Sequence, residues 1–160
     1  MTATTYESDA VAGFAEGLAP GPLVGLDPGT RTIGVALSDR TRMIASPFRL
    51  IRRTKFAADG ATLLAVTTEN AACGIVVGLP RNMDGSEGPR AQSVRAFVRN
   101  LAGLTELPIL FWDERLSTVA AERAMIDAGL SRAKRGERID AAAAAFILQG
   151  ALDRLGRLAR

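Results

Sequence analysis

Two short apolar runs, Leu23–Leu26 and Ile33–Leu37, flank the turn-forming segment Asp27–Arg31. A Pro-Gly pair between short apolar runs is typical of two strands joined by a turn, so we predict a β-hairpin here. Asp27 would stand at the end of a buried strand, and Gly29 would let a ligand approach the backbone. An aspartate in an Asp-Pro-Gly segment is equally suited to a purely structural turn. This segment alone favours neither interpretation.

Strand and helix patterns alternate along the rest of the chain. Short apolar runs predict further strands at Met43–Ile51, Ile75–Leu79 and Pro108–Trp112. The spacing of apolar residues predicts four helices, over Phe56–Asn70, around Val94–Leu101, from Ser117 or Thr118 to about Ala128, and from Ala141 to Leu155. Early strands followed by alternating helices and strands are typical of an α/β or α+β domain with a mixed sheet.

The chain divides into a tail and one domain. Residues 1–21 mix Thr, Ala, Gly and acidic residues, so we expect a flexible N-terminal tail, and one folded domain over 22–160. All 20 basic residues but only 14 of the 17 acidic residues lie in this domain, which therefore carries a formal charge of +6. That surplus favours an acidic partner such as a nucleic-acid backbone. A balance of this size is also common on an ordinary solvated surface.

Composition excludes several classes of chemistry. The chain has no histidine, which excludes His-based acid/base catalysis, Ser-His-Asp triads and His-ligated zinc. Its one cysteine, Cys73, excludes an internal disulfide framework and is expected to be a small buried residue. No apolar run approaches the ~18 residues of a membrane span, and the first residues lack the pattern of a secretion or import signal. We therefore expect a cytoplasmic protein without membrane association.

Further carboxylates lie at the ends of apolar elements. Asp113 and Glu114 directly follow the last predicted strand. Asp140 is followed at spacings of 4 and 7 by Ala144 and Ile147, which puts it on the inward side of its helix. The alternative for Asp140 is an acidic residue near a helix start, where it favours the helix dipole.

Carboxylates that converge at the carboxyl ends of neighbouring strands repel one another unless a divalent cation lies between them. Oxygen ligands without His or Cys favour Mg²⁺ or Mn²⁺ over zinc. Such a site can activate water and stabilise the displacement of a phosphoryl group. The pattern therefore indicates a metal-dependent enzyme that acts on phosphate esters.

Four segments carry a resemblance to a known family. They are 27–36 (DPGTRTIGVA), 77–86 (VGLPRNMDGS), 112–118 (WDERLST) and 140–143 (DAAA). In this order, across about residues 22–155, they resemble the YqgF family, also called RuvX. Its members are described as Holliday junction resolvases and as the nuclease that matures the 5′ end of pre-16S rRNA.

The resemblance implies an α/β fold of the RNase H-like class, with a five-stranded mixed sheet flanked by helices. It also implies that Asp27, Glu114 and Asp140 are the catalytic and metal-binding residues. The choice of Glu114 over Asp113 rests on the resemblance, because strand alternation alone leaves both open. Ala143 stands where related resolvases carry a second aspartate, so we expect weaker binding of any second metal ion.

Basic residues near these acidic positions are candidate contacts for substrate phosphates. They are Arg31, Arg81, Arg115, Arg132, Lys134 and Arg135. Arg81 opens the loop 81–88 between a strand and a helix, where backbone amides can also bind phosphate. The stretch 131–138 brings positive charge close to Asp140 in sequence. A flexible connector for the first segment and a solvated charged loop for the second are the structural alternatives.

The resemblance thus implies a metal-dependent endonuclease that matures the 5′ end of pre-16S rRNA, with precursor rRNA as its partner. The alternative is a Holliday junction resolvase that acts on branched DNA, for which a homodimer is expected. Two other classes compete. Sugar-kinase, actin and chaperone-type ATPases have a phosphate loop that also reads as Asp followed by Gly-Thr and then Gly. That fold needs two such domains, and this chain has room for one. A non-catalytic RNase H-like module would not need all three carboxylates.

Overall fold

The computed structural model describes residues 2–116 and 132–159, and for 132–140 the backbone only. The sheet has the strand order β1-β6-β5-β2-β3-β4. Its strands are β1 (Thr5–Tyr6), β2 (Leu23–Pro28), β3 (Thr32–Ser38), β4 (Ala45–Arg52), β5 (Gly74–Leu79) and β6 (Ile109–Asp113). β2, β3 and β4 pair antiparallel, whereas β5 is parallel to both β2 and β6. The predicted hairpin and the predicted mixed sheet are therefore confirmed.

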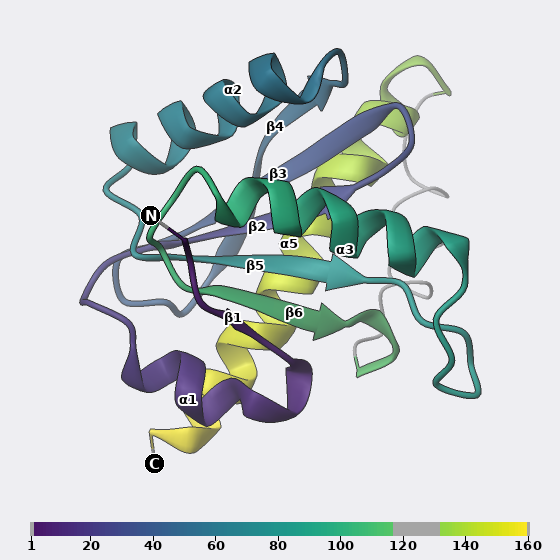
Figure 1. Cartoon of the computed structure of the whole chain (residues 1–160). Helices are drawn as coiled ribbons and strands as arrows, with labels where there is room; N and C mark the ends of the chain where they lie inside the picture. Colours follow the sequence, from purple (N-terminus) through teal and green to yellow (C-terminus); the bar gives the residue numbers. More distant parts are fainter. Residues whose placement is uncertain (1, 117–131, 160) are drawn as a thin grey trace.

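Helices cover both faces of the sheet (Figure 1). They are the short α1 (Val11–Glu16), α2 (Phe56–Glu69), α3 (Pro89–Ala102) and α5 (Arg132–Leu158), with single 3-10 turns η1 (Ser8–Ala10) and η2 (Glu114–Leu116). α2 and α3 pack on one face, where Val24, Leu26 and Val77 point. α5 packs on the other face, against Leu23, Val76 and Leu110. Consecutive residues of each central strand thus belong to two different cores, as the period-two geometry of a strand requires.

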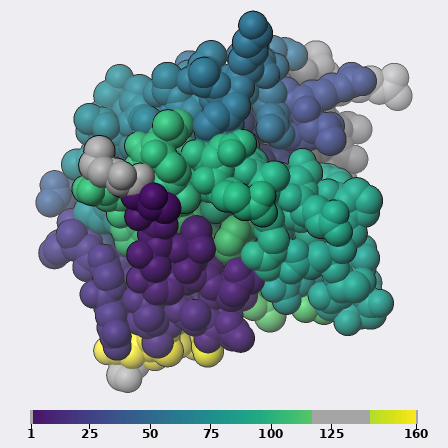
Figure 2. Space-filling view, viewed as in Figure 1, coloured from purple at the N-terminus to yellow at the C-terminus, as the bar shows by residue number. Residues whose placement is uncertain are grey.

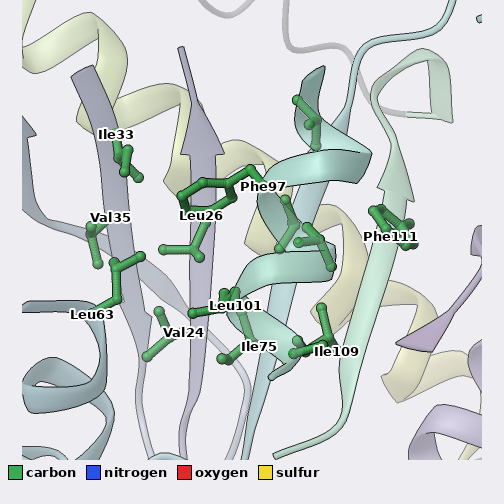
Figure 3. Packing of buried hydrophobic residues seen from close by; sticks show 14 of the residues in the cluster. Val24, Leu26, Ile33, Val35, Leu63, Ile75, Phe97, Leu101, Ile109 and Phe111 are labelled. Atoms are coloured by element: carbon green, nitrogen blue, oxygen red, sulfur yellow. The ribbon is translucent and has the colours of Figure 1, made fainter. Parts of the chain in front are cut away.

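The larger core lies between the sheet and α2 and α3. Figure 3 shows Val24 and Leu26 of β2, Ile75 of β5 and Ile109 of β6 facing Leu101 of α3. The aromatic ring of Phe97, also on α3, packs edge-on against Phe56 of α2, with 5.7 Å between the ring centroids. α2 and α3 are thereby fixed to each other as well as to the sheet.

Small residues let α5 lie close to the sheet. Ala144 and Ala151 are fully buried on this helix. On β2, a Cβ atom at Gly25 would stand 2.7 Å from Leu148 Cβ and 3.0 Å from the backbone oxygen of Ala144. Gly25 therefore sets how near the helix comes to the centre of the sheet.

The N-terminal segment differs from the expected flexible tail. β1 adds a sixth strand by pairing in parallel with β6, through Thr5↔Ile109 and Tyr6↔Leu110. Phe14 of α1 is fully buried in the core beneath α5. In Figure 2 the segment lies across the lower part of the molecule, next to the C-terminal residues. The prediction of a tail was wrong here because a two-residue strand and a six-residue helix carry too little periodicity to recognise.

The predicted helix from Ser117 or Thr118 to Ala128 lies outside the described residues. Within the described residues, no helix combines the length and apolar character of a membrane span.

Candidate functional site

Asp27 and Glu114 lie on the walls of one cleft of about 380 Å³. The cleft opens where β2 and β6 end. Its other lining residues are Gly29, Thr30, Arg31, Thr32 and Arg90. The structure therefore brings together two of the predicted acidic residues, from segments far apart in sequence, beside two arginines.

Strand alternation in β2 directs Asp27 to the side of the sheet that α5 covers. Leu23 packs in the core beneath α5, whereas Val24 and Leu26 pack in the opposite core. Gly25 faces α5 directly. Asp27 follows Gly25 by two residues, so its carboxylate points to the α5 side at the strand's carboxyl end.

The same rule places Glu114 on that side. Leu110 and Trp112 of β6 belong to the core beneath α5. Glu114 is the next residue in this alternation and opens the turn η2. Its Oε1 reaches over β5, since a Cβ atom at Gly78 would stand only 2.9 Å from it. Because β5 lies between β6 and β2, this direction takes the carboxylate toward Asp27.

Asp113 has a different role. Its side chain is 5% exposed and accepts hydrogen bonds from the Arg115 side chain, with 2.7 Å between Nη2 and Oδ2, and from the Arg115 backbone amide at 3.0 Å. Burial acts to raise the pKa of Asp113, but these bonds and the Arg115 charge outweigh it and hold that pKa below its ordinary value. Asp113 is thus an anchor for Arg115. In the choice that the sequence left open, Glu114 is the residue that lines the cleft with Asp27.

Asp140 lies within α5, eight residues after the helix begins at Arg132. Its side chain is outside the described part of the structure. A charge interacts with the helix dipole most strongly in the first turn. Because the helix starts at Arg132, Asp140 lies beyond that turn. By helical spacing its backbone position shares a face with Ala144 and Ile147, both of which are fully buried against the sheet.

The predicted basic residues separate into four groups, of which Arg81 forms one by itself. Arg31 is exposed and lines the cleft with Asp27. Arg115 donates to Asp113 and to the backbone oxygen of Met83 at 3.3 Å. Arg132, Lys134 and Arg135 lie at the start of α5, where side chains are not described.

Arg81 lies away from the cleft, in an ion-pair cluster that anchors the N-terminal segment. It contacts Glu7 at 3.4 Å and Glu87 at 3.5 Å and lines a separate pocket of about 800 Å³. Arg95 of α3 binds the same two glutamates, with distances of 2.7 Å to Glu7 and 2.6 Å to Glu87. The hydrogen bond from Arg95 is the main cause of a lowered pKa at both Glu7 and Glu87.

Sequence reasoning missed Arg90. It lies in the first turn of α3, lines the cleft and approaches the backbone oxygen of Pro28 at 3.5 Å. The available signal was Pro89, which is typical of the first turn of a helix and fixes where α3 starts. Identifying Arg90 as a site residue also required knowing how α3 is oriented relative to β2.

The donor set of the cleft suits a hard divalent cation. Asp27 and Glu114 offer carboxylate oxygens, which Mg²⁺ and Mn²⁺ prefer. Gly78 leaves the space over β5 that the Glu114 carboxylate occupies, a space that a side chain would fill. Among the described side chains no group of three acidic, His or Cys residues is placed to hold a metal ion. The third carboxylate expected from the sequence, Asp140, lies outside the described side chains.

The sequence matches a family model described as RuvX, Holliday junction resolvase, over residues 21–154. This chain belongs to the RuvX family. RuvX relatives match it over nearly their whole length. One from Paracoccus denitrificans is 64% identical over 92% of this chain and 94% of its own, and one from Rhodobacter capsulatus is 66% identical over 88% of both. Each bears the name "Putative pre-16S rRNA nuclease".

Solved structures show how the RuvX fold relates to other nucleases. Thermus thermophilus RuvC in complex with a Holliday junction superposes with a TM-score of 0.55 at 16% identity, covering 85% of this chain and 96% of RuvC. The yeast mitochondrial Holliday junction resolvase superposes with a TM-score of 0.54 at 10% identity, over 94% of this chain and 86% of that one. These likenesses confirm the predicted RNase H-like fold. The sheet has six strands rather than five because of β1.

Proposed function

We propose that this protein is a metal-dependent endonuclease that cleaves phosphodiester bonds in precursor 16S rRNA. One observation carries the proposal: Asp27 and Glu114 line the same cleft beside Arg31 and Arg90. Carboxylates next to arginines at the carboxyl ends of parallel strands suit a cation and the phosphate it acts on. The names of the relatives from Paracoccus denitrificans and Rhodobacter capsulatus support rRNA as the substrate. An rRNA substrate also accounts for the cytoplasmic location that we propose.

The carboxylates of Asp27, Glu114 and Asp140 would hold Mg²⁺ or Mn²⁺. When bound there, the ion would supply a water acidic enough to attack phosphorus at neutral pH and would offset charge on the phosphate. Arg31 and Arg90 bind the phosphate oxygens and orient the scissile bond. Gly29, between Asp27 and Arg31, lets the substrate backbone approach the strand end. Arg132, Lys134 and Arg135, whose backbone lies at the start of α5, are the further residues that we propose for contacts to flanking phosphates.

A Holliday junction resolvase is the second candidate, and the description of the matching family favours it. The two candidates share the cleft and differ in substrate. Resolution of a four-way junction requires two symmetric cuts and therefore predicts a homodimer. Maturation of one rRNA end requires one cut and makes no such demand.

The deciding experiment compares cleavage of a pre-16S rRNA fragment and of a four-way DNA junction, each with Mg²⁺, with Mn²⁺ and with EDTA. We expect cleavage of the rRNA fragment that EDTA abolishes. D27N and E114Q should be inactive, whereas D113N is the matched control next in sequence and should retain activity while folded. Undiminished cleavage in EDTA would refute the metal requirement. Inactive D113N beside active E114Q would exchange the roles of these two residues.

A non-catalytic nucleic-acid-binding module is the remaining alternative. Such a module would bind the rRNA fragment without cutting it under any of these metal conditions. Its binding would also be indifferent to D27N and E114Q beyond the change in charge.

A further inference from the structure

β4 forms one edge of the sheet, and its carboxyl end borders the cleft. It is the last strand in the sheet order, bonded on one side to β3. The register pairs Arg52, at the end of β4, with Thr32, at the start of β3. Thr32 is one of the residues that line the cleft of Asp27 and Glu114. The edge of β4 therefore leads directly to the site.

A β-bulge turns an aromatic ring out of this edge. Arg49 pairs with Val35 and Pro47 pairs with Ala36, so that Phe48 has no opposite residue on β3. Phe48 is 47% exposed. Bulges bend a strand locally and re-aim a side chain, and they are frequent beside active sites. An exposed phenyl ring in this position gives a base a flat surface to stack on.

The same edge is strongly basic. Residues 40–58 contain six Lys and Arg and no Asp or Glu. Two of these arginines hold the fold, since Arg42 donates to the backbone oxygen of Gly21 at 2.7 Å and Arg53 donates to that of Gly29 at 2.5 Å. Arg49 and Arg52 are exposed on β4 itself. The two exposed arginines flank the approach from Phe48 to the cleft.

Strand register places Arg52 on the catalytic side of the sheet. Asp27 pairs with Gly34, and Gly34 pairs with Leu50, so these three positions form one row across β2, β3 and β4. Arg52 follows Leu50 by two residues and therefore points to the same side of the sheet as Asp27. Arg49 precedes Leu50 by one residue and pairs with Val35, so it points to the opposite side of the sheet.

We infer that Phe48, Arg49 and Arg52, here called the β4 edge, bind a single-stranded segment of the nucleic acid beside the cleavage site. A base stacks on Phe48, while Arg49 and Arg52 contact phosphates on either side of the strand. This inference rests on the proposed function and specifies the form of its substrate. The segment is single-stranded because a base must leave its neighbours to stack on a protein ring.

A second copy of the chain is the competing occupant, and charge disfavours it. Two β4 strands paired about a two-fold axis would bring the exposed arginines of both copies together, and like charges across a strand pair are destabilising. Pro47 lacks the backbone N–H that edge pairing uses. Nucleic acid instead complements both the charge and the exposed ring.

The test measures binding of a fluorescent single-stranded RNA 12-mer to the full chain in EDTA, where cleavage does not interfere. F48A should weaken binding roughly 5- to 150-fold, which is the loss of one stacked base. F48Y keeps an aromatic face and should restore binding to within about twofold of the wild type. The matched control is L158A, which removes another exposed apolar side chain, 43% exposed, at the far end of α5.

The charge component is read from salt dependence. R49A should reduce the slope of log affinity against log salt by about 0.7, the value for one phosphate contact on a single strand. R99A is the matched control, because Arg99 is an exposed arginine on α3. F48A should leave the slope unchanged, since stacking releases no counterions.

Each result decides the inference independently of cleavage. Wild-type affinity and slope in F48A and R49A would overturn it and leave the nuclease proposal intact. Failure of the wild type to bind the 12-mer would also overturn it, and cleavage of the pre-16S fragment would still decide the nuclease proposal. Equal losses for F48A on an RNA duplex would refute the single-stranded assignment. A change of sedimentation coefficient in F48A would assign the β4 edge to contact between copies instead.

Discussion

The Glu114 carboxylate lies directly over Gly78, with Oε1 2.9 Å from the point that a Cβ atom on Gly78 would occupy. The same Cβ would stand 2.5 Å from Cδ1 of Ile147, a fully buried residue of α5. The lack of a side chain at Gly78 thus leaves room both for Ile147 of α5 and for the Glu114 carboxylate. Gly78 is therefore needed both for the packing of α5 and for the position of the Glu114 carboxylate.

We predict that G78A loses most of its nuclease activity and also loses stability. The added methyl group must displace Glu114 and Ile147, and overpacking of this kind costs about 1–3 kcal/mol. Cleavage rates and urea unfolding curves measure the two effects. G25A is the control, since its Cβ would collide with Leu148 and the Ala144 backbone and not with Glu114. Equal loss of activity in G25A and G78A, at equal stability, would show that displacement of Glu114 is not the cause.

We predict that Mg²⁺ raises the melting temperature of the wild type and raises it much less in D27N and E114Q. A ligand at 100 times its Kd stabilises the folded state by about 2.7 kcal/mol. For a domain of this size, that corresponds to a rise of roughly 5–10 °C. Without metal, both variants should be at least as stable as the wild type, because each removes one of several neighbouring negative charges. A full metal-induced rise in inactive variants would mean that the ion binds elsewhere.

We predict that the ion pairs of Glu7 and Glu87 with Arg81 and Arg95 make the stability of the fold sensitive to acid. The pKa values of Glu7 and Glu87 lie below their ordinary value of 4.5, first because Arg95 donates hydrogen bonds to them. Carboxylates with lowered pKa values stabilise the fold above pH 4.5 and lose that contribution as the pH falls through the folded-state values. E7Q should therefore be less stable than the wild type at pH 7, and the difference should shrink below pH 4.5.

The expected loss in E7Q at pH 7 is about 1 kcal/mol or less, because the Glu7 side chain is 43% exposed and its ion pairs are screened by water. Chemical unfolding between pH 3 and pH 7 measures it. E16Q, which removes an exposed carboxylate from the same segment, is the control and should follow the wild type. A wild-type to E7Q difference that grows toward pH 3 would contradict the sign of this argument.

We predict that F14A destabilises the whole domain by about 3–5 kcal/mol, the usual cost of truncating a buried phenylalanine. Phe14 contributes to the core beneath α5, so its loss should lower the single unfolding transition rather than release a local segment. M83A removes a side chain that is 89% exposed and should change stability by less than about 0.5 kcal/mol. Equal stability of F14A and M83A would restore the view of residues 1–21 as a loose tail.

The fold was predictable wherever a helix or strand is long enough for the spacing of its apolar residues to show a regular pattern. The β2–β3 hairpin followed from apolar runs around a Pro-Gly turn, and α3 from the spacing of Val94, Phe97 and Leu101. The N-terminal segment was not predictable, because β1 is two residues long and is fixed by its partner β6. Its anchor, the pairing of Glu7 with Arg95, joins residues 88 positions apart and leaves no local trace.

The site was predictable as residue types and less so as geometry. Asp27 and Glu114 were identified from sequence, and the structure adds that they line one cleft. The choice between Asp113 and Glu114 needed one further fact, namely which side of β6 faces α5. Arg81 was a reasonable phosphate ligand until its partners were known, since only the tertiary fold brings Glu7 to it.

The close packing of α5 also fixes the distance between this helix and the sheet. Methyl groups of Ala144 and Ala151 set the thickness of the layer between helix axis and sheet. The earlier turns of this helix carry Asp140, while Asp27 lies on β2 and Glu114 directly follows β6. In the proposed site, a cation would lie between Asp140 on this helix and the carboxylates of Asp27 and Glu114, so the distance across it depends on alanines that do not contact it. Enlarging one of these alanines should weaken metal binding without changing any ligand.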